Sequence, residues 1–240
     1  MNNLLATLLV AVGLGALVRA VFADEVKACF ERDPAARNLV EVLLTYAGLH
    51  AVIAYRIAHA LETARIPVLP RWIMSVARWA TGIEIHPAAT IGRGLFIDHG
   101  MGVVIGETAV IGDGVTIFQG VTLGGTGKDR GKRHPTIGNH VVIGTGAKVL
   151  GNITIGDHSI VGANAVVIRN VPEHSTVVGV PGRITKIKDQ QVPGLMLDHT
   201  HLPDPIAQRL AKLQREIDDL EKHFKDLRRA VPGTPPPQQP

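Results

Sequence analysis

Two histidines stand where the sequence could hold a proton-transfer group beside charged side chains. One lies in Asp98-His99-Gly100, and the other lies in Lys132-Arg133-His134-Pro135. Glu84 precedes His99 by fifteen residues. A carboxylate beside an imidazole holds its tautomer and stabilises the imidazolium, so such a pair can take a proton from an alcohol. We therefore interpret His99 and Glu84 as a candidate general-base dyad.

A six-residue repeat must position these side chains. Glycine often follows the repeated aliphatic residue, as in Ile91-Gly92 and Ile143-Gly144. Six residues form one short strand and a corner, and three such units close a coil of about 18 residues whose aliphatic side chains stack inside. The pattern predicts a left-handed parallel β-helix. The aliphatic positions are Ile85, Ile91, Ile97, Ile105, Ile111, Ile117, Leu123, Ile137, Ile143, Val149, Ile155, Val161 and Val167.

The repeat is interrupted twice, and each interruption carries one of the two histidines. Between Ile97 and Ile105 the spacing is eight instead of six, and between Leu123 and Ile137 it is fourteen. Departures from a repeat cost regularity, so insertions indicate the binding face. With a coil of about 18 residues, Glu84 lies about one turn before His99, and we expect both on one face.

Helical patterns flank the repeat on both sides, so we predict an α+β chain. Apolar residues between Leu39 and Leu61 follow helical spacing, and a shorter helix is expected near residues 73–80. After the repeat, apolar residues spaced by four and three predict an amphipathic helix, which forms a coiled coil or packs on its own subunit. The predicted parts are a helical domain over 1–80, the β-helix over 81–187, a linker over 188–204, a helix over 205–229 and a disordered Pro-rich tail over 230–240.

Composition narrows the possible classes of protein. Of the 240 residues, 45% are hydrophobic and 4% are aromatic, which favours a regular core of small aliphatic side chains. The net charge is +4, and no basic run is interleaved with aromatic residues, so we expect no nucleic-acid partner. The single cysteine, Cys29, excludes an intrachain disulfide and fits the cytoplasm. We interpret Cys29 as structural.

The N-terminal stretch is apolar on every side between residues 4 and 18. A membrane-spanning helix needs about 20 apolar residues, and a signal peptide needs a basic start that Met1-Asn2-Asn3 lacks. We therefore expect a buried helix, and membrane contact or export through residues 4–22 is the alternative.

Several runs resemble those of serine O-acetyltransferases, a family of hexapeptide-repeat acyltransferases. The likeness covers residues 25–187, and the Asp-His-Gly-Met-Gly and Gly-Gly-Thr-Gly-Lys runs are its most specific parts. The resemblance implies transfer of an acetyl group from acetyl-CoA to the hydroxyl of L-serine for cysteine biosynthesis, without a metal. The runs are 32–37, 55–59, 83–89, 97–108, 119–128, 132–135 and 179–183.

The resemblance also implies roles for individual residues in catalysis and serine binding. His99 is the general base, and Glu84 takes the place of its carboxylate partner, which is Asp in the long-form enzymes. Asp33, from the helical domain, and Asp98 bind the serine amine.

The remaining roles implied by the resemblance concern contacts between subunits. Arg133 binds the serine carboxylate, and His134 contacts the substrate across a subunit boundary. Coenzyme A lies along the groove between the coils of adjacent subunits. The residues expected to line that groove are Thr126, Thr145, Ala163 and Arg183.

The implied assembly is a homotrimer, which the long-form enzymes pair into a dimer of trimers through the helical domain. That domain is short in this chain, which argues against pairing. The chain ends in Pro-Gln-Gln-Pro rather than the isoleucine that docks into O-acetylserine sulfhydrylase, so we do not expect that complex. Members of the family are often inhibited by cysteine at the serine site.

Other functions compete with this interpretation. An acetyltransferase for homoserine or a sugar would share the fold, but Asp33, Asp98 and Arg133 together suit a zwitterionic amino acid. Some β-helices bind zinc through three histidines and hydrate carbon dioxide, and here only His99 and His134 are placed to contribute. A purely structural scaffold would leave both insertions without a purpose. The other histidines singled out, which we interpret as structural, are His50, His59, His86, His140, His158 and His174.

Overall fold

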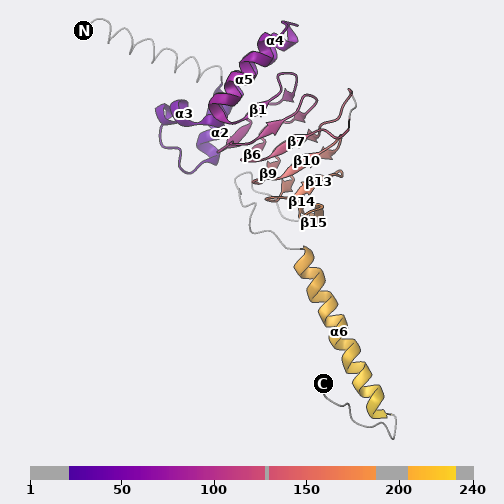
Figure 1. Cartoon of the computed structure of the whole chain (residues 1–240). Helices are drawn as coiled ribbons and strands as arrows, with labels where there is room; N and C mark the ends of the chain where they lie inside the picture. The colour runs from indigo at the N-terminus through magenta and orange to yellow at the C-terminus, as the bar shows by residue number, and fades with distance from the viewer. Residues whose placement is uncertain (1–21, 128–129, 188–204, 231–240) are drawn as a thin grey trace, which may run out of the picture. The chain divides into compact units, whose positions relative to one another are not determined.

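The computed structural model of the chain describes residues 22–127, 130–187 and 205–230 (Figure 1). The predictions for residues 4–21, for the linker over 188–204, for the tail after residue 230 and for Lys128 lie outside the described residues. The chain divides near residue 202 into two units, which are described separately.

The repeat forms a parallel β-helix whose short strands belong to three sheets, as predicted. Face 1 contains β1 (Glu84–Ile85), β4 (Val104–Ile105), β7 (Thr122–Gly124), β10 (Lys148–Leu150) and β13 (Val166–Val167). Face 2 contains β2 (Thr90–Ile91), β5 (Val110–Ile111), β8 (Thr136–Ile137) and β11 (Thr154–Ile155). Face 3 contains β3 (Phe96–Asp98), β6 (Thr116–Phe118), β9 (Val142–Ile143), β12 (Ile160–Val161), β14 (Ser175–Val178) and the antiparallel β15 (Arg183–Ile187).

Strand register measures the length of each coil. Regular coils pair residues 18 apart, as in Val104 with Thr122. The coil that contains the first interruption pairs Glu84 with Val104, a separation of 20. The coil that contains the second pairs Val110 with Thr136, a separation of 26. The insertions of two and eight residues therefore leave the coil as the sequence predicts, and the ladder continues on both sides of them.

The repeated aliphatic residues fill the interior, and none of the thirteen is more than 6% exposed. Stacked Val, Ile and Leu side chains pack well on short strands, so hydrophobic burial holds the coils together.

Two corners of the β-helix carry the predicted site residues His99 and His134. The His99 corner joins face 3 to face 1. It consists of residues 99–103, 119–121, 144–147 and 162–165. The His134 corner joins face 1 to face 2, and its described residues are 86–89, 106–109, 125–127, 130–135 and 151–153.

Helices α2 (Ala23–Arg32), α3 (Leu39–Thr45), α4 (Ala47–Thr63) and α5 (Leu69–Thr81) precede the β-helix, as the apolar spacing predicts. Asn38 caps α3 by accepting the backbone N–H of Glu41 at 2.9 Å. Pro70 lies in the first turn of α5, where proline is tolerated. Among the described helices, none passes alone for a membrane span by length and hydropathy, and only α3 and α4, bent by 70°, pass as a pair.

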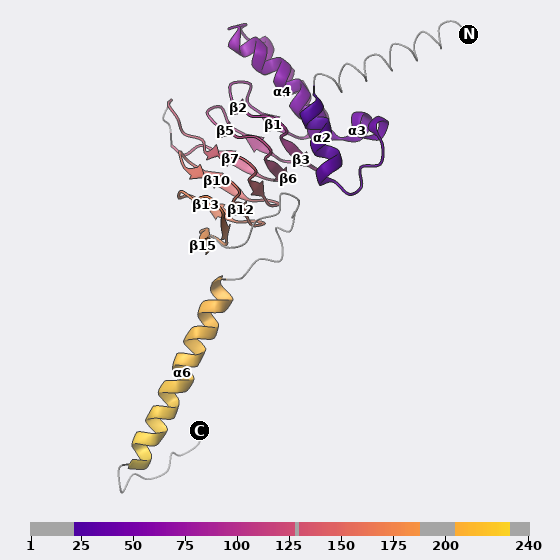
Figure 2. The same cartoon turned by 180° about the vertical axis from the view of Figure 1, so that it is seen from behind.

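Polar contacts fasten these helices to the first coils of the β-helix, beside which the helices lie in Figure 2. The Arg32 guanidinium donates to the carbonyls of Gly94 and Val115 at 3.2 and 3.1 Å, and the Tyr55 hydroxyl donates to the carbonyl of Ala89 at 2.6 Å. At Gly48 a Cβ would lie 2.1 Å from a backbone oxygen on β3, so only glycine lets α4 approach that strand. The start of α4 is thereby held beside the residues that follow β3.

The C-terminal unit contains helix α6 (Pro205–Ala230), where the heptad pattern predicts a helix. Five apolar side chains of its predicted stripe are exposed on the helix. The exposed members are Leu210, Leu213, Ile217, Leu220 and Phe224.

Three of the histidines interpreted as structural form a column along the third corner of the β-helix. His140, His158 and His174 adopt left-handed backbone conformations with φ of 54°, 55° and 53°. Their rings stack at centroid distances of 5.1 and 5.0 Å. Cys29 is buried between helices and β3, and burial raises the pKa of its thiol to about 12, so it is a poor nucleophile.

Candidate active site

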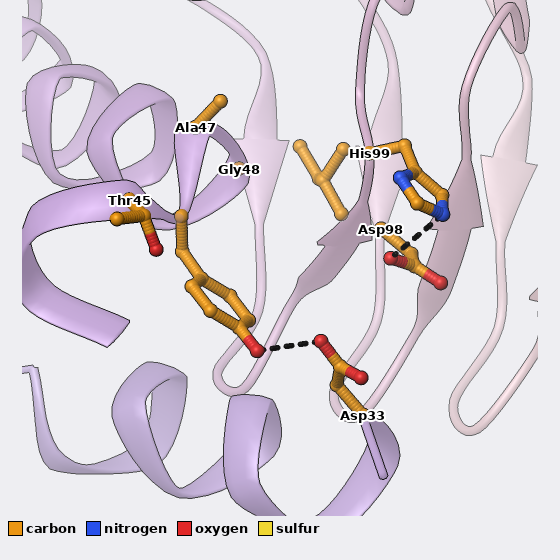
Figure 3. A pocket seen from close by; sticks show the side chains of 8 residues that line it. Asp33, Thr45, Ala47, Gly48, Asp98 and His99 are labelled. Atoms are coloured by element: carbon orange, nitrogen blue, oxygen red, sulfur yellow. Dashed lines mark hydrogen bonds and ion pairs between the residues drawn. The ribbon is translucent and has the colours of Figure 1, made fainter. Parts of the chain in front are cut away.

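A pocket of about 250 Å³ opens where the helices meet the His99 corner (Figure 3). The β-helix contributes Asp98 and His99, and the helical segment contributes Asp33 and Tyr46. Three of the predicted site residues, Asp33, Asp98 and His99, therefore meet within one chain. The other lining residues are Thr45, Ala47, Gly48 and Ile97.

The two-residue insertion carries the His99 imidazole outward. His99 has a φ of 58°, and Gly100 after it has a φ of 80°, so the chain turns sharply away from β3. A Cβ at Gly100 would lie 2.4 Å from the Ile83 side chain, so glycine is required there. The His99 side chain is 73% exposed, and its Nε2 lies 3.8 Å from Asp98 Oδ1. This ring is free to meet a substrate, and a carboxylate is near to stabilise its charged form.

Asp33 is held by two short hydrogen bonds at the end of α2. Its Oδ2 accepts the Tyr46 hydroxyl at 2.6 Å, and its Oδ1 accepts the backbone N–H of Ala35 at 2.7 Å. Burial, and then the Asp33 carboxylate, hold the pKa of Tyr46 well above its usual value, so the phenol stays a donor. The pocket thus presents two carboxylates, Asp33 and Asp98, beside an imidazole.

The Glu84 carboxylate, predicted as the partner of His99, is not among the residues that line the pocket of His99. Glu84 lies on β1 of face 1, whereas His99 follows β3 of face 3. The insertion lengthens this coil to 20 residues, so Glu84 pairs with Val104, and fifteen residues fall short of a turn. Glu84 Oε2 instead accepts from Arg78 at 2.9 Å, and the carboxylate is half exposed. Within one chain, Asp98 is the carboxylate beside His99.

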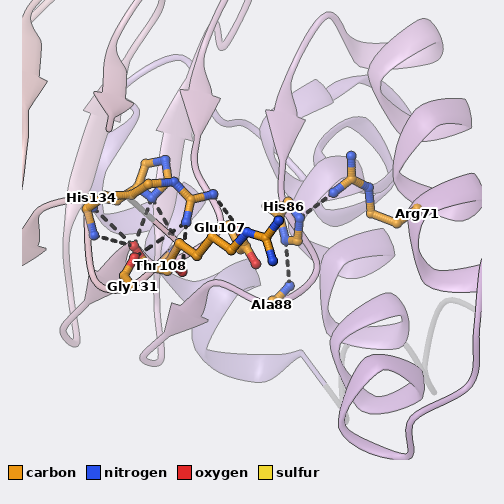
Figure 4. Close-up of polar contacts among 9 residues, drawn as sticks. Arg71, His86, Ala88, Glu107, Thr108, Gly131 and His134 are labelled. Atoms are coloured by element: carbon orange, nitrogen blue, oxygen red, sulfur yellow. Dashed lines mark hydrogen bonds and ion pairs between the residues drawn. The ribbon is translucent and has the colours of Figure 1, made fainter. Parts of the chain in front are cut away.

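Arg133 and His134 lie at the His134 corner, and neither lines the pocket of His99 within one chain. Figure 4 shows His134 together with Glu107 and Thr108. The Arg133 guanidinium forms an ion pair with Glu107, and this contact holds the pKa of the Glu107 carboxyl below its usual value. His134 is 8% exposed, and burial first, then Arg133, lower the pKa of its imidazole. The ring is therefore held neutral.

The predicted coenzyme residues divide between the two corners. Thr145 and Ala163 lie on successive coils of the His99 corner, and Arg183 begins β15 opposite Val178. Thr126 lies at the His134 corner, where its hydroxyl would be 3.2 Å from a Cβ built on Gly151. The His99 corner also holds Gln119, whose Oε1 is buried and accepts no hydrogen bond from the described residues.

Sequence reasoning missed three residues of these sites: Tyr46, Glu107 and Thr108. Thr108 lies 26 residues before His134, which is the length of the coil with the second insertion, so the register could have revealed it. No signal for Tyr46 exists in the repeat, because its position depends on how α3 and α4 pack on the first coil.

Metal ligands are not clustered in the part of the chain that the structure describes. No three His, Cys, Asp or Glu side chains there are arranged to hold an ion. His99 and His134, which the zinc alternative requires together, lie at different corners of one chain.

Known proteins resemble this chain over most of its length. The family model of bacterial transferase hexapeptide (six repeats) matches residues 134–169. A serine acetyltransferase of Bacillus pumilus (strain SAFR-032) is 55% identical over 206 residues, which are 86% of this chain and 94% of the relative. The chain belongs to the serine acetyltransferase family. It is therefore an acyltransferase, as the motifs predict.

Solved serine acetyltransferases share the fold. One in complex with cysteine has a TM-score of 0.74 and 41% identity, over 78% of this chain and 73% of the other. One in complex with CoA has a TM-score of 0.64 and 45% identity, over 68% of this chain and 67% of the other. Their similarity covers the helices and the β-helix rather than the hexapeptide repeat alone.

Proposed function

We propose that this serine acetyltransferase transfers the acetyl group of acetyl-CoA to the hydroxyl of L-serine, with His99 as the general base. The observation that carries the proposal is the pocket that joins His99 to Asp33 and Asp98. Two carboxylates suit the ammonium group of an amino acid, whereas a sugar hydroxyl has no positive charge to match them.

Serine binds with its ammonium group at Asp33 and Asp98, which leaves its hydroxyl beside the His99 ring. The Tyr46 hydroxyl uses one lone pair of Asp33 Oδ2 and the Ala35 N–H uses one lone pair of Oδ1, so each oxygen keeps a second lone pair for the ligand. Asp33, at the end of α2, and His99, on the β-helix, thus contact the same serine molecule. Holding the serine hydroxyl beside the base in this way lowers the entropic cost of the reaction.

The reaction is a direct transfer. Neutral His99 takes the proton of the serine hydroxyl while the serine oxygen forms a bond to the thioester carbonyl carbon. The resulting oxyanion needs hydrogen-bond donors, and the Asp98 carboxylate stabilises the imidazolium. The carbon–sulfur bond then breaks, and the imidazolium returns the proton to the CoA thiolate. The products are O-acetyl-L-serine and CoA.

A second copy of the chain completes the site. Arg133 suits the serine carboxylate, but the His134 corner that carries it is separated from the His99 corner by the width of face 1. In a ring of three copies related by rotation, each interface is formed by one surface of a chain and a different surface of its neighbour. The His99 corner of one chain therefore meets the His134 corner of the next. The active site is therefore shared, and the assembly is a homotrimer.

Coenzyme A lies in the groove between two copies. Thr145, Ala163 and Arg183 come from the chain that supplies His99, and Thr126 comes from its neighbour. The orphaned Gln119 oxygen supports this placement, because a buried acceptor without a partner favours a ligand donor such as a pantetheine amide. We assign the chain to the cytoplasm, since its buried lone cysteine suits a reducing compartment.

A thiol-release assay tests the function. Purified chain with acetyl-CoA should release CoA rapidly with L-serine and slowly with D-serine, L-homoserine or glucosamine. L-cysteine should inhibit in competition with serine if it occupies the same carboxylate-lined pocket. Equal rates with glucosamine would contradict the assignment of the acceptor.

A further inference from the structure

Thr108 is the centre of the hydrogen bonds that hold the loop before β8, and the mechanism above gives it no task. Its Oγ1 accepts the backbone N–H groups of Arg133 and His134 at 3.0 and 3.1 Å. Its carbonyl accepts the Lys132 ammonium at 2.7 Å. One partly buried threonine therefore fixes three consecutive residues of the insertion (Figure 4).

The same threonine determines the tautomer of His134. The ring Nδ1 lies 3.1 Å from the backbone nitrogen of Thr108 and 2.9 Å from its Oγ1. A backbone N–H can only donate, so Nδ1 must accept and carries no proton. The neutral imidazole then has its proton on Nε2. The hydroxyl uses its hydrogen toward Nδ1 and its lone pairs for the two N–H groups, so the single lone pair of Nδ1 is shared by the Thr108 hydroxyl and the Thr108 backbone N–H.

The free end of the ring lies beside two glycines. A Cβ at Gly106 would lie 2.0 Å from His134 Nε2, and one at Gly125 would lie 3.2 Å from it. A side chain at Gly106 would collide with the ring and one at Gly125 would crowd it, so glycine at both positions makes room for this end of His134. The adjacent residue, Glu107, forms the ion pair with Arg133, so Glu107 and Thr108 together hold Arg133 and His134 one coil further on.

We propose that Thr108 is a positioning residue that locks His134 as its Nε2–H tautomer and so makes it a fixed hydrogen-bond donor toward the bound substrate, not a second base. The inference rests on the proposed function, because that function places the His134 corner at the shared site. A hydrogen-bond donor that is already oriented toward the substrate does not have to reorient when negative charge develops on the reacting carbonyl.

The test compares three variants of the full chain. Thr108→Val removes the hydroxyl and keeps the shape, Thr108→Ser keeps the hydroxyl, and Thr154→Val makes the same change on β11 at an exposed residue. NMR of protein labelled with 13C-histidine reports the tautomer and pKa of each ring, and His134→Gln assigns the signal of residue 134.

Wild type, Thr108→Ser and Thr154→Val should show His134 as the Nε2–H tautomer. In Thr108→Val, the backbone N–H of residue 108 still donates to Nδ1, but the hydroxyl donor is lost. The tautomer should therefore persist, while the pKa of His134 should rise, because the neutral ring loses one of its two donors. The value of kcat/KM for serine should fall roughly 10- to 100-fold in this variant only, because misplacement of a substrate-contacting group costs about that much.

Several outcomes would overturn the proposal or isolate its parts. A wild-type His134 that is cationic or protonated on Nδ1 at neutral pH overturns it, and this result needs no variant to fold. An unchanged His134 signal in folded Thr108→Val also overturns it, whatever the activity. A raised His134 pKa in Thr108→Val with unchanged activity supports the role of Thr108 and instead contradicts the role of His134 in the proposed function.

Discussion

The two corners of the β-helix that carry the candidate site are built in opposite ways. At the His99 corner the imidazole is 73% exposed, and its nearest carboxylate oxygen is 3.8 Å away. At the His134 corner the imidazole is 8% exposed, and its Nδ1 lies within 3.1 Å of two Thr108 donors. One ring is open to gain and lose a proton, and the other is fixed and neutral.

The same repeat therefore positions two different kinds of functional group, a general base and a substrate-binding group. A general base must exchange a proton with the substrate, so few contacts should compete for its nitrogens. A binding group gains from being held in one orientation before the ligand arrives. The short insertion projects a single side chain, whereas the long insertion is folded back on the coil by Glu107 and Thr108.

The largest effect should come from removing the exposed imidazole. His99→Asn should lower kcat about 10²- to 10⁴-fold, because general-base catalysis contributes that much. Asparagine tolerates the left-handed backbone at this position, so the fold should persist. His140→Asn is the matched control, since His140 has nearly the same φ but lies at the third corner. Near-normal turnover of His99→Asn would remove the base from the mechanism.

A smaller loss of activity should follow a substitution at the His134 corner that keeps the positive charge of the side chain. Arg133→Lys retains the positive charge but loses the planar fork that can bind Glu107 and a carboxylate together. We expect kcat/KM for serine to fall roughly 10- to 100-fold, the equivalent of about 1.5–3 kcal/mol for a hydrogen bond to a charged group. Most of the change should appear in KM for serine, and steady-state kinetics at varied serine would measure it. An unchanged KM would argue that Arg133 does not touch the serine carboxylate.

The next effect concerns the partner of Asp33. Tyr46→Phe removes one hydrogen bond of 2.6 Å to the Asp33 carboxylate and leaves the ring in place. The expected cost is roughly 3- to 10-fold in kcat/KM, since one such bond is worth about 1 kcal/mol. Steady-state kinetics at varied serine would measure it. An unchanged kcat/KM in Tyr46→Phe would show that the hydroxyl of Tyr46 does not position Asp33.

The smallest effect is the pH dependence of stability. The pKa of His134 lies below its unfolded value near 6.5, so the unfolded chain binds more protons in that range. The stability gained from the neutral ring is therefore present above about pH 6.5 and is lost as the pH falls through the folded pKa. Thermal unfolding at both ends of this window should show a smaller acid shift for His134→Gln than for wild type. An equal shift would mean that His134 is not the group that titrates.

The fold could be predicted because a β-helix repeats along the chain, so its core positions recur at a fixed spacing in the sequence. Each inward position of a coil must be aliphatic, so Ile85 to Val167 reveal the repeat, and the spacings around Ile97 and Leu123 reveal both insertions. The position of Glu84 was harder to predict for the same reason. The insertion of two residues lengthens its own coil from about 18 residues to 20, so a spacing of fifteen residues is five short of a turn there.

Contacts between separate elements could not be derived in this way. Asp33 reaches the pocket only because Arg32, Arg56 and Gly48 dock the helices on the first coils, and no period in the sequence encodes that arrangement. The resemblance to a known family suggested Asp33, but Tyr46 became visible only with the packing. The contact of Thr108 with His134 was accessible from the coil lengths and was overlooked.

The most direct test of the shared site is complementation between two inactive variants. His99→Asn and Arg133→Ala would be co-expressed in equal amounts with different tags, and doubly tagged assemblies would be isolated and assayed. In a closed trimer that contains both variants, a site taking His99 from one chain and Arg133 from the next has both intact residues at one of the three junctions, which is about one third of the sites. We predict activity near one third of wild type, far above either variant alone. Mixed assemblies that stay as inactive as the separate variants would show that one chain builds the whole site, and would contradict the account.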